Sequence, residues 1–232
     1  EELASQYDYE RYNLANLRQK YENIQFTGNI QDAGTKKIGE SLDVLPARVV
    51  ESINGIDVAS GLDPAGKITE KRVIKIKEPY INTQPLYHEA AHCLHANLRE
   101  EVTDDVLRMP VSNFDKEWSN VAKIDYEYDF LNNKKNTPLK VDSDVFGDIW
   151  SGEKPGSKEA TEPRLGLIRP YSSEDIMEDV ATYVEVVYTK PEFFKPLIDP
   201  TSKKYDSRYL NKLELLKKYE FITPEMFNKV TQ

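Results

Sequence analysis

Cysteine, histidine and long apolar stretches are scarce in this sequence of 232 residues. The one cysteine, Cys93, excludes a disulfide within the chain. No run of about 18 consecutive apolar residues occurs, so the sequence predicts no transmembrane helix. Basic residues are also too few for a nucleic-acid partner: 31 Lys and Arg stand against 40 Asp and Glu, and the net charge is -9. Phosphate binding depends on neutralisation by Lys and Arg, so we expect no nucleic-acid partner.

What is present favours a folded α+β protein. The composition, 39% hydrophobic and 31% charged, is that of a globular chain rather than a disordered one. At this length we expect a single domain over 1–232, with a small sheet-containing lobe over about 1–100 and a mostly helical lobe over about 101–232. The sequence does not begin with Met, which is typical of a polypeptide whose targeting segment has been removed.

Periodicity and capping signals predict the individual elements. Helices are expected over about 6–24, from Pro46, over 83–100, 172–188 and 207–219, and again from Thr223; a strand is expected over 72–77, and an exposed loop over 151–166. In the strand, β-branched residues alternate with lysines, a pattern that fits a half-buried sheet position.

The motif His88-Glu89-Ala-Ala-His92 places two of the three histidines four positions apart in the helix expected over 83–100. Residues at this spacing lie on the same face, so both imidazole rings can direct a nitrogen at one metal ion. Glu89 points about 100° around the helix, from where its carboxylate reaches a water on that ion without binding the ion itself. This pattern is typical of zinc hydrolases, so we expect His88 and His92 to bind Zn²⁺ and Glu89 to act as general base. The alternative is an alanine-rich buried helix that carries two histidines by chance.

His95 and Cys93 lie on the same helix, but we expect structural roles for both. His95 is seven positions beyond His88, about 10 Å along the axis, which is too far for both rings to bind one ion with short bonds. We therefore expect His95 to pack beside the ligands or support them rather than to bind metal. Cys93 faces away from the metal and is expected to be a buried free thiol.

The third protein ligand has to be a carboxylate, because the histidines are accounted for and a catalytic zinc keeps three protein ligands with one open position. The helix expected over 172–188 carries four acids beside an apolar stripe: Glu174, Asp175, Glu178 and Asp179. Asp175 forms a capping-box-like start with Ser172, and Glu174 complements the helix dipole from the first turn. Glu178 lies at the edge of the apolar face without such a role, so we assign it as the third ligand. The other three acids remain alternatives, as does a Glu178 that merely extends to solvent.

Two motifs, His88-Glu-Ala-Ala-His92 and Ser172-Ser-Glu-Asp-Ile-Met-Glu178-Asp-Val-Ala, resemble those of the zinc-binding metallopeptidases known as substrate import-associated zinc metallohydrolase lipoproteins. That family is similar to the catalytic domain of lethal-factor-type metalloproteases, within the gluzincin group. The resemblance implies a zincin-like fold. It also implies that Tyr171, seven residues before Glu178, donates a hydrogen bond to the oxyanion of the reaction.

The sequence departs from the lethal-factor pattern in two places. The gap between His92 and Glu178 is longer, so an insertion has to fold over or beside the cleft. Many gluzincins have an Asp four residues after the ligand Glu, whereas this chain has Thr182. The carboxylate that would orient a ligand histidine is therefore unassigned, and Asp179 is one candidate for it.

The expected function is zinc-dependent hydrolysis of peptide bonds, in which Glu89 activates a zinc-bound water and Tyr171 stabilises the oxyanion. The substrate is expected to be a peptide or protein that pairs with an edge of the sheet near 72–77, as the resemblance implies. The resemblance further implies an extracytoplasmic protein, anchored by lipid at the bacterial outer membrane or cell surface beside nutrient-import components. The lipid would be carried by a cysteine that is not part of this sequence.

The alternative is a binding or accessory protein that holds zinc on a zincin scaffold without cleaving peptides. Glu89 disfavours it, because a purely structural zinc site needs no general base and is usually closed by four protein ligands.

Overall fold

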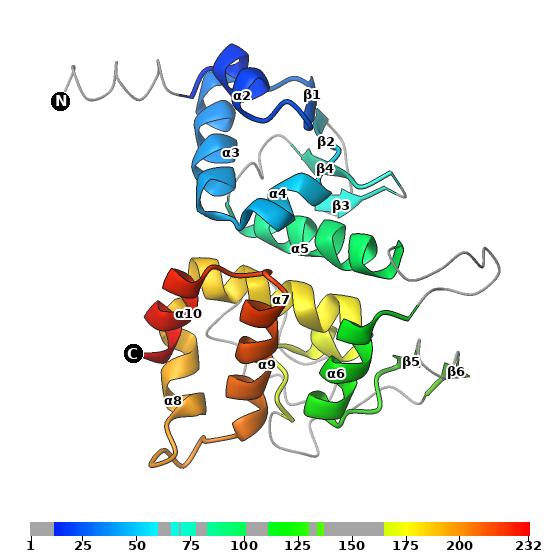
Figure 1. Ribbon diagram of the computed structural model, residues 1–232, viewed down its shortest axis with the longest axis vertical. Coiled ribbons are helices and arrows are strands. Elements are labelled where there is room, and N and C mark those ends of the chain that lie inside the picture. The colour runs from blue at the N-terminus through cyan, green and yellow to red at the C-terminus, as the bar shows by residue number, and fades with distance from the viewer. Residues whose placement is uncertain are drawn as a thin grey trace. The chain divides into compact units, whose positions relative to one another are not determined.

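The computed structural model describes residues 12–59, 66–69, 71–77, 83–100, 111–129, 134–136 and 165–232. In this part of the chain a four-stranded mixed sheet with helices is followed by a mostly helical C-terminal part, which confirms the α+β class (Figure 1). The chain divides into two compact units, the first comprising Glu1–Asn97 and Glu220–Thr223, the second Leu98–Tyr219 and Pro224–Gln232. The single domain over 1–232 stays a prediction.

The sheet of the first unit consists of β1 (Gln25–Gly28), β2 (Gly55–Ala59), β3 (Gly66–Ile68) and β4 (Val73–Lys77), in the order β1-β2-β4-β3. β1, β2 and β4 are parallel, and β3 pairs antiparallel with β4 at one edge. In β4, Ile74 and Ile76 are fully buried and alternate with partly exposed residues. The strand expected over 72–77 is therefore confirmed. It is paired on both sides, and among the described strands β3 lies at the edge beside it.

The described helices of the first unit are α2 (Leu14–Lys20), α3 (Asp32–Val44), α4 (Ala47–Ser52) and α5 (Thr83–Glu100), and the last three residues of α5 belong to the second unit. α4 begins directly after Pro46, as expected. α2 is shorter than the helix expected over 6–24, because Tyr21 leaves the helical conformation and the chain turns toward β1; residues 6–11 lie outside the described part. α3 was not expected from the sequence.

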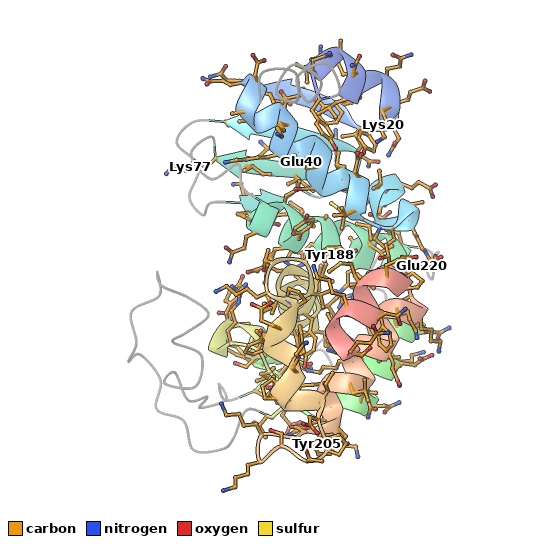
Figure 2. The ribbon with its side chains drawn as sticks, turned by 90° about the vertical axis from the view of Figure 1, so that its left-hand side faces the viewer. Lys20, Glu40, Lys77, Tyr188, Tyr205 and Glu220 are labelled. Atoms are coloured by element: carbon orange, nitrogen blue, oxygen red, sulfur yellow. The ribbon has the colours of Figure 1, made fainter. Side chains whose placement is uncertain are left out.

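Asp43 near the end of α3 holds the N-terminal segment in place. Its carboxylate accepts hydrogen bonds from the hydroxyls of Tyr12 and Tyr21 and pairs with the ammonium of Lys20. Lys20, the last residue of α2, is labelled in Figure 2. Desolvation raises the pKa of Asp43, but the hydrogen bonds from Lys20, Tyr21 and Tyr12 outweigh it, so the pKa lies below its ordinary value. The charged form of Asp43 therefore favours the folded state.

The second unit is mostly helical. Its elements are α6 (Asn113–Ala122), β5 (Tyr128–Asp129), β6 (Lys134–Lys135), the 3-10 helix η3 (Pro170–Ser173), α7 (Ile176–Thr189), the 3-10 helix η4 (Pro191–Phe194), α8 (Lys195–Ile198), α9 (Ser207–Lys218) and α10 (Pro224–Thr231). The short strands β5 and β6 pair antiparallel. In the described residues, no helix is both long and apolar enough to cross a membrane.

A charged cluster lies in the core of the second unit. Lys212 of α9 and Asp179 of α7 are both fully buried, and their charged groups are 2.6 Å apart. The same Asp179 oxygen accepts hydrogen bonds from Trp118 Nε1 at 2.9 Å and the Tyr126 hydroxyl at 2.6 Å. Lys212 also donates to the carbonyl of Gly166 at 2.8 Å. The cluster thereby joins α6, α7 and α9 with the segment that leads into η3.

The helices expected in the C-terminal half are found with shifted boundaries. α7 begins at Ile176 rather than Ser172, and its expected apolar stripe is buried. α9 buries Leu213 and Leu216 as expected, but Leu210 is only partly buried. α10 begins at Pro224, in agreement with the expected start at Thr223. Of the loop expected over 151–166, residues 151–164 lie outside the described part.

Candidate metal centre

α5 brings His88 and His92 together. Their Nε2 atoms are 3.1 Å apart, and the two rings meet edge to face with centroids 4.7 Å apart. The spacing of four positions in a helix produces this convergence without any help from a second segment. Both side chains are largely buried, 9% and 7% exposed, so their nitrogens are shielded from bulk water.

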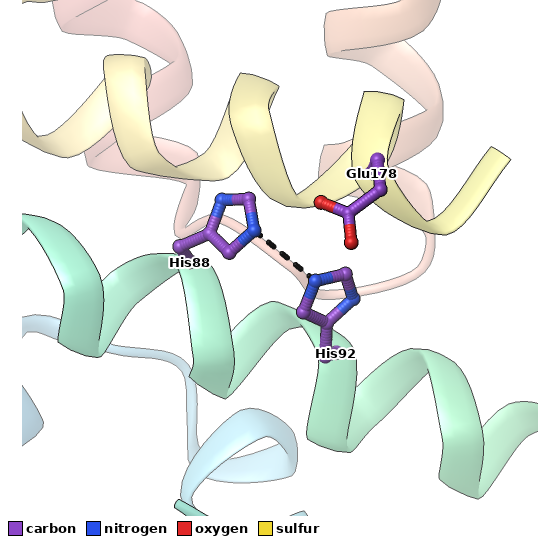
Figure 3. Close-up of side chains that lie close together, drawn as sticks. All are labelled: His88, His92 and Glu178. Atoms are coloured by element: carbon purple, nitrogen blue, oxygen red, sulfur yellow. Dashed lines mark hydrogen bonds between the residues drawn. The ribbon is translucent and has the colours of Figure 1, made fainter. Parts of the chain in front are cut away.

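Glu178 completes a group that could hold a metal ion. Within the described residues, His88, His92 and Glu178 each offer one ligand atom, and these atoms all lie within 4.8 Å of one another (Figure 3). Two nitrogens bound to one tetrahedral zinc ion at about 2.0–2.1 Å would lie about 3.3 Å apart. The Nε2 separation of 3.1 Å fits such a shared ion.

Two acids around the start of α7, Asp175 and Glu174, are placed differently from what the sequence indicated. Asp175, rather than Ser172, is the N-cap, and its carboxylate accepts the backbone N–H of Glu178 at 3.0 Å. Ser172 lies in η3, so the expected capping box between Ser172 and Asp175 is wrong. Glu174 is exposed and lies before the helix rather than in its first turn.

The expected position of Glu178 within its helix is also wrong. It is the third residue of α7, in the first turn, where a carboxylate commonly has a capping role. Its side chain nevertheless reaches His88 and His92, as Figure 3 shows. Asp179, the candidate for orienting a ligand histidine, instead binds Lys212, Trp118 and Tyr126 in the core of the second unit.

Glu89 follows His88 on α5 and is 7% exposed. Its side chain lies close to Gly66 at the start of β3: a β-carbon added to Gly66 would be 3.2 Å from both Cγ and Oε1 of Glu89. The candidate base is therefore held between the motif helix and the edge strand of the sheet. No local sequence pattern indicates this contact, because β3 and α5 are separate segments of the chain.

Tyr171 lies in η3 and is 36% exposed. Desolvation raises its pKa most, followed by the negative charge of Glu178 and a side-chain hydrogen bond to it. The guanidinium of Arg169 lies 5.3 Å from the centre of the Tyr171 ring and is in turn paired with the buried Glu185 at 3.3 Å. The Tyr171 hydroxyl thus keeps its proton and is able to donate a hydrogen bond.

Cys93 and His95 have the structural surroundings that the sequence indicated. Cys93 is a free, fully buried thiol whose S–H faces the carbonyl of Arg72 at 3.7 Å, and burial raises its pKa strongly. His95 is fully buried and meets the ring of Phe221 edge to face, with centroids 6.2 Å apart. Neither belongs to the group of three ligand atoms.

The charged cluster in the second unit was missed by sequence reasoning. Its signal is Lys212, which occupies a core position of α9, three residues after Tyr209 and four before Leu216, and is fully buried like both. A lysine at such a position needs a buried counter-charge. The sequence does not say which of the 40 acids supplies it.

Comparison with known proteins adds no family assignment. No family model, no curated protein and no solved structure matches the chain.

Proposed function

We propose that this chain is a zinc-dependent peptidase whose ion is bound by His88, His92 and Glu178. The observation that carries the proposal is the convergence of their ligand atoms, all within 4.8 Å of one another. Two imidazoles and one carboxylate form a donor set used by catalytic zinc, which keeps a fourth position open. Structural zinc sites are usually closed by four protein ligands, so a group of three favours catalysis.

The chemistry assigns a role to each residue around the ion. A bound zinc ion would polarise the carbonyl of the substrate and lower the pKa of water. Glu89 would take the proton of the attacking water and transfer it to the leaving amine. Tyr171 would donate a hydrogen bond to the oxyanion, a contribution of about 2.7–4 kcal/mol for a well-placed donor. The products are a carboxylic acid and an amine.

The substrate class follows from the sheet. Under the proposed zincin-like fold, a peptide in extended conformation would be added to a free sheet edge through backbone hydrogen bonds, which tolerate many side chains. Among the described strands, β3 is the edge strand beside β4, and its first residue lies next to Glu89. We therefore propose β3, rather than the strand over 73–77, as the strand that receives a peptide or protein substrate.

The resemblance of the two motifs to lipoprotein metallohydrolases supports a proposed location. We place the protein outside the cytoplasm, anchored by lipid at the bacterial outer membrane or cell surface beside nutrient-import components. Fractionation of the full-length protein from its native cell, with and without lipoprotein processing, tests this assignment.

Metal analysis tests the ligand set. The native chain is expected to retain about one zinc ion per chain after dialysis, and Glu178→Ala to lose most of it, because two remaining histidines form an incomplete site. Glu174→Ala and Asp175→Ala are the matched controls, since both acids are neighbours in sequence with other surroundings. Full zinc occupancy in Glu178→Ala would refute the assignment.

Hydrolysis of a peptide library separates the peptidase from the zinc-holding accessory protein. The zinc-loaded native chain should cleave members of the library, and Glu89→Gln should retain zinc but cleave about 10²- to 10⁴-fold more slowly, the usual contribution of a general base. Stoichiometric zinc in both proteins without cleavage by either would support the accessory protein instead.

A further inference from the structure

Gly66 occupies a confined position at the start of β3. A β-carbon there would be 3.2 Å from Cγ and from Oε1 of Glu89, and 3.4 Å from Cβ of Pro85. The first two separations are shorter than most van der Waals contacts between such atoms, so an added methyl group would force a shift of a few tenths of an ångström. The space beside Gly66 is thus taken up by the candidate base.

The backbone of Gly66 does not itself require glycine. Among the described glycines only Gly28 and Gly166 have a positive φ, so an alanine at position 66 keeps its backbone conformation without strain. The residue also pairs with Ile76 in the antiparallel ladder of β3 and β4, which limits how far the strand can withdraw. Alanine would therefore act mainly on the neighbouring side chain.

Glu89 is the group that has to move. Pro85 lies one turn earlier on α5 and bounds the same space, and its ring is fixed to the helix backbone. The Glu89 side chain can rotate about its single bonds. Because it is only 7% exposed, a displaced carboxylate has to adopt another rotamer among closely packed neighbours. A change at Gly66 is thereby transmitted to the orientation of the carboxylate.

We infer that Gly66 is a positioning residue for Glu89: the missing side chain at the start of β3 leaves the space in which the Glu89 carboxylate lies. The inference rests on the proposed function for its catalytic meaning, but the contact itself belongs to the metal-free chain. It assigns to the edge strand a second task besides receiving substrate, namely to set the orientation of the base.

Four variants test the inference: Gly66→Ala, the bulkier Gly66→Val, Glu89→Gln for scale, and Lys37→Ala as the control. Lys37 lies on α3, outside the sheet, and its side chain is exposed, so its removal leaves Glu89 and the proposed substrate strand unchanged. Zinc content is expected to be the same in all four, because none of these residues is a proposed ligand. Thermal unfolding checks that each variant folds, and Gly66→Ala is decisive if Gly66→Val does not.

The expected loss of activity increases with the size of the side chain at position 66. For the peptide cleaved fastest by the native chain, kcat should fall about tenfold in Gly66→Ala and about 10²-fold in Gly66→Val, with KM little changed, since a misplacement of about 1 Å costs about 10²-fold. Binding of a peptide hydroxamate to the zinc-loaded protein, a probe whose hydroxyl can donate to the base carboxylate, should weaken in the same order. Lys37→Ala should match the native chain in both assays.

A crystal structure of metal-free Gly66→Ala gives a readout that does not depend on zinc or on activity. It should show the Glu89 carboxylate displaced from its position in the native chain. An unmoved carboxylate, together with native hydroxamate affinity, would overturn the inference while leaving the peptidase proposal intact. Conversely, a displaced carboxylate in a chain that neither binds zinc nor cleaves peptides would uphold the contact and refute the proposed function.

Discussion

The buried pair of Lys212 and Asp179 predicts an unusual dependence of stability on pH. The perturbation is Asp179→Asn, which keeps the shape of the side chain and an oxygen acceptor for Trp118 and Tyr126 but removes the negative charge. In the native chain the ammonium of Lys212 is 2.6 Å from that charge and 2.8 Å from the carbonyl of Gly166. In the variant this fully buried ammonium lacks its counter-ion.

The loss of unfolding free energy depends on whether the buried Lys212 keeps or releases its proton in the variant. Burial lowers its pKa, and Asp179 opposes this shift, so removal of Asp179 lowers the pKa further. Loss of the proton at about pH 7 by an amine with an unfolded pKa of about 10.4 costs about 4.6 kcal/mol, and about 1.9 kcal/mol at about pH 9. Removing one partner of a buried pair typically costs about 3–5 kcal/mol. We therefore expect Asp179→Asn to lose about 3–5 kcal/mol of unfolding free energy at about pH 7 and to regain about 2–3 kcal/mol by about pH 9.

The sign of this recovery is fixed by linkage. Between about pH 7 and 9 the unfolded variant keeps the lysine proton that the folded variant gives up, so its stability rises with pH. Urea unfolding followed by far-ultraviolet circular dichroism at both pH values measures it. The double variant Asp179→Asn with Lys212→Met removes the buried amine that lacks a counter-ion, so it should be more stable than Asp179→Asn alone. An equal loss at both pH values, or a double variant less stable than Asp179→Asn, would refute the reasoning.

Two further predictions concern the half-buried Asp206 and the buried Cys93. Desolvation raises the pKa of Asp206, the N-cap of α9, but the hydrogen bonds and charge of Arg208 outweigh it and hold the pKa below its ordinary value. Its contribution is present above the unfolded pKa of about 3.9 and is lost as pH falls through the folded value. Asp206→Asn should accordingly lower the melting temperature at neutral pH and make it less sensitive to acid, and an unchanged acid dependence would contradict this. Cys93, fully buried and with a raised pKa, should react with a thiol reagent only at the rate of unfolding, and rapid stoichiometric labelling of the native chain would contradict it.

The sequence indicated the elements whose pattern is local. The strand over 73–77 alternates isoleucine and lysine, and α5 and α9 carry apolar residues at helical spacing. α3 was not expected because glycine disfavours the interior of a helix, whereas Gly34 and Gly39 both lie buried inside this one. A β-carbon on Gly39 would be 2.2 Å from the ring of Tyr12. That glycine is required by packing from another segment, which no local pattern reveals.

The candidate metal site also has one part that local sequence predicts and one part that it does not. His88 and His92 converge because of their spacing in one helix, so they could be predicted from five consecutive residues. The proposed third ligand, Glu178, lies 86 positions after His92 in the sequence, and its assignment relied on a helix start that is wrong. Ser172 and Asp175 are both good N-cap residues, and only the preceding 3-10 turn decides between them.

Three acids near the start of α7 therefore carry three separable effects, although the sequence presents them as neighbours. Asp175 accepts a backbone N–H, Asp179 pairs with Lys212, and Glu178 lies with the two histidines. Loss of an N-cap costs about 1 kcal/mol, and loss of a buried counter-ion costs about 3–5 kcal/mol. Removal of Glu178 should instead abolish zinc binding at little cost to the metal-free fold. The Glu178 variant should therefore lose zinc and keep its stability, whereas the Asp175 and Asp179 variants should lose stability and keep zinc. A Glu178 variant that is severely destabilised without zinc would assign that carboxylate to the fold rather than to the ion.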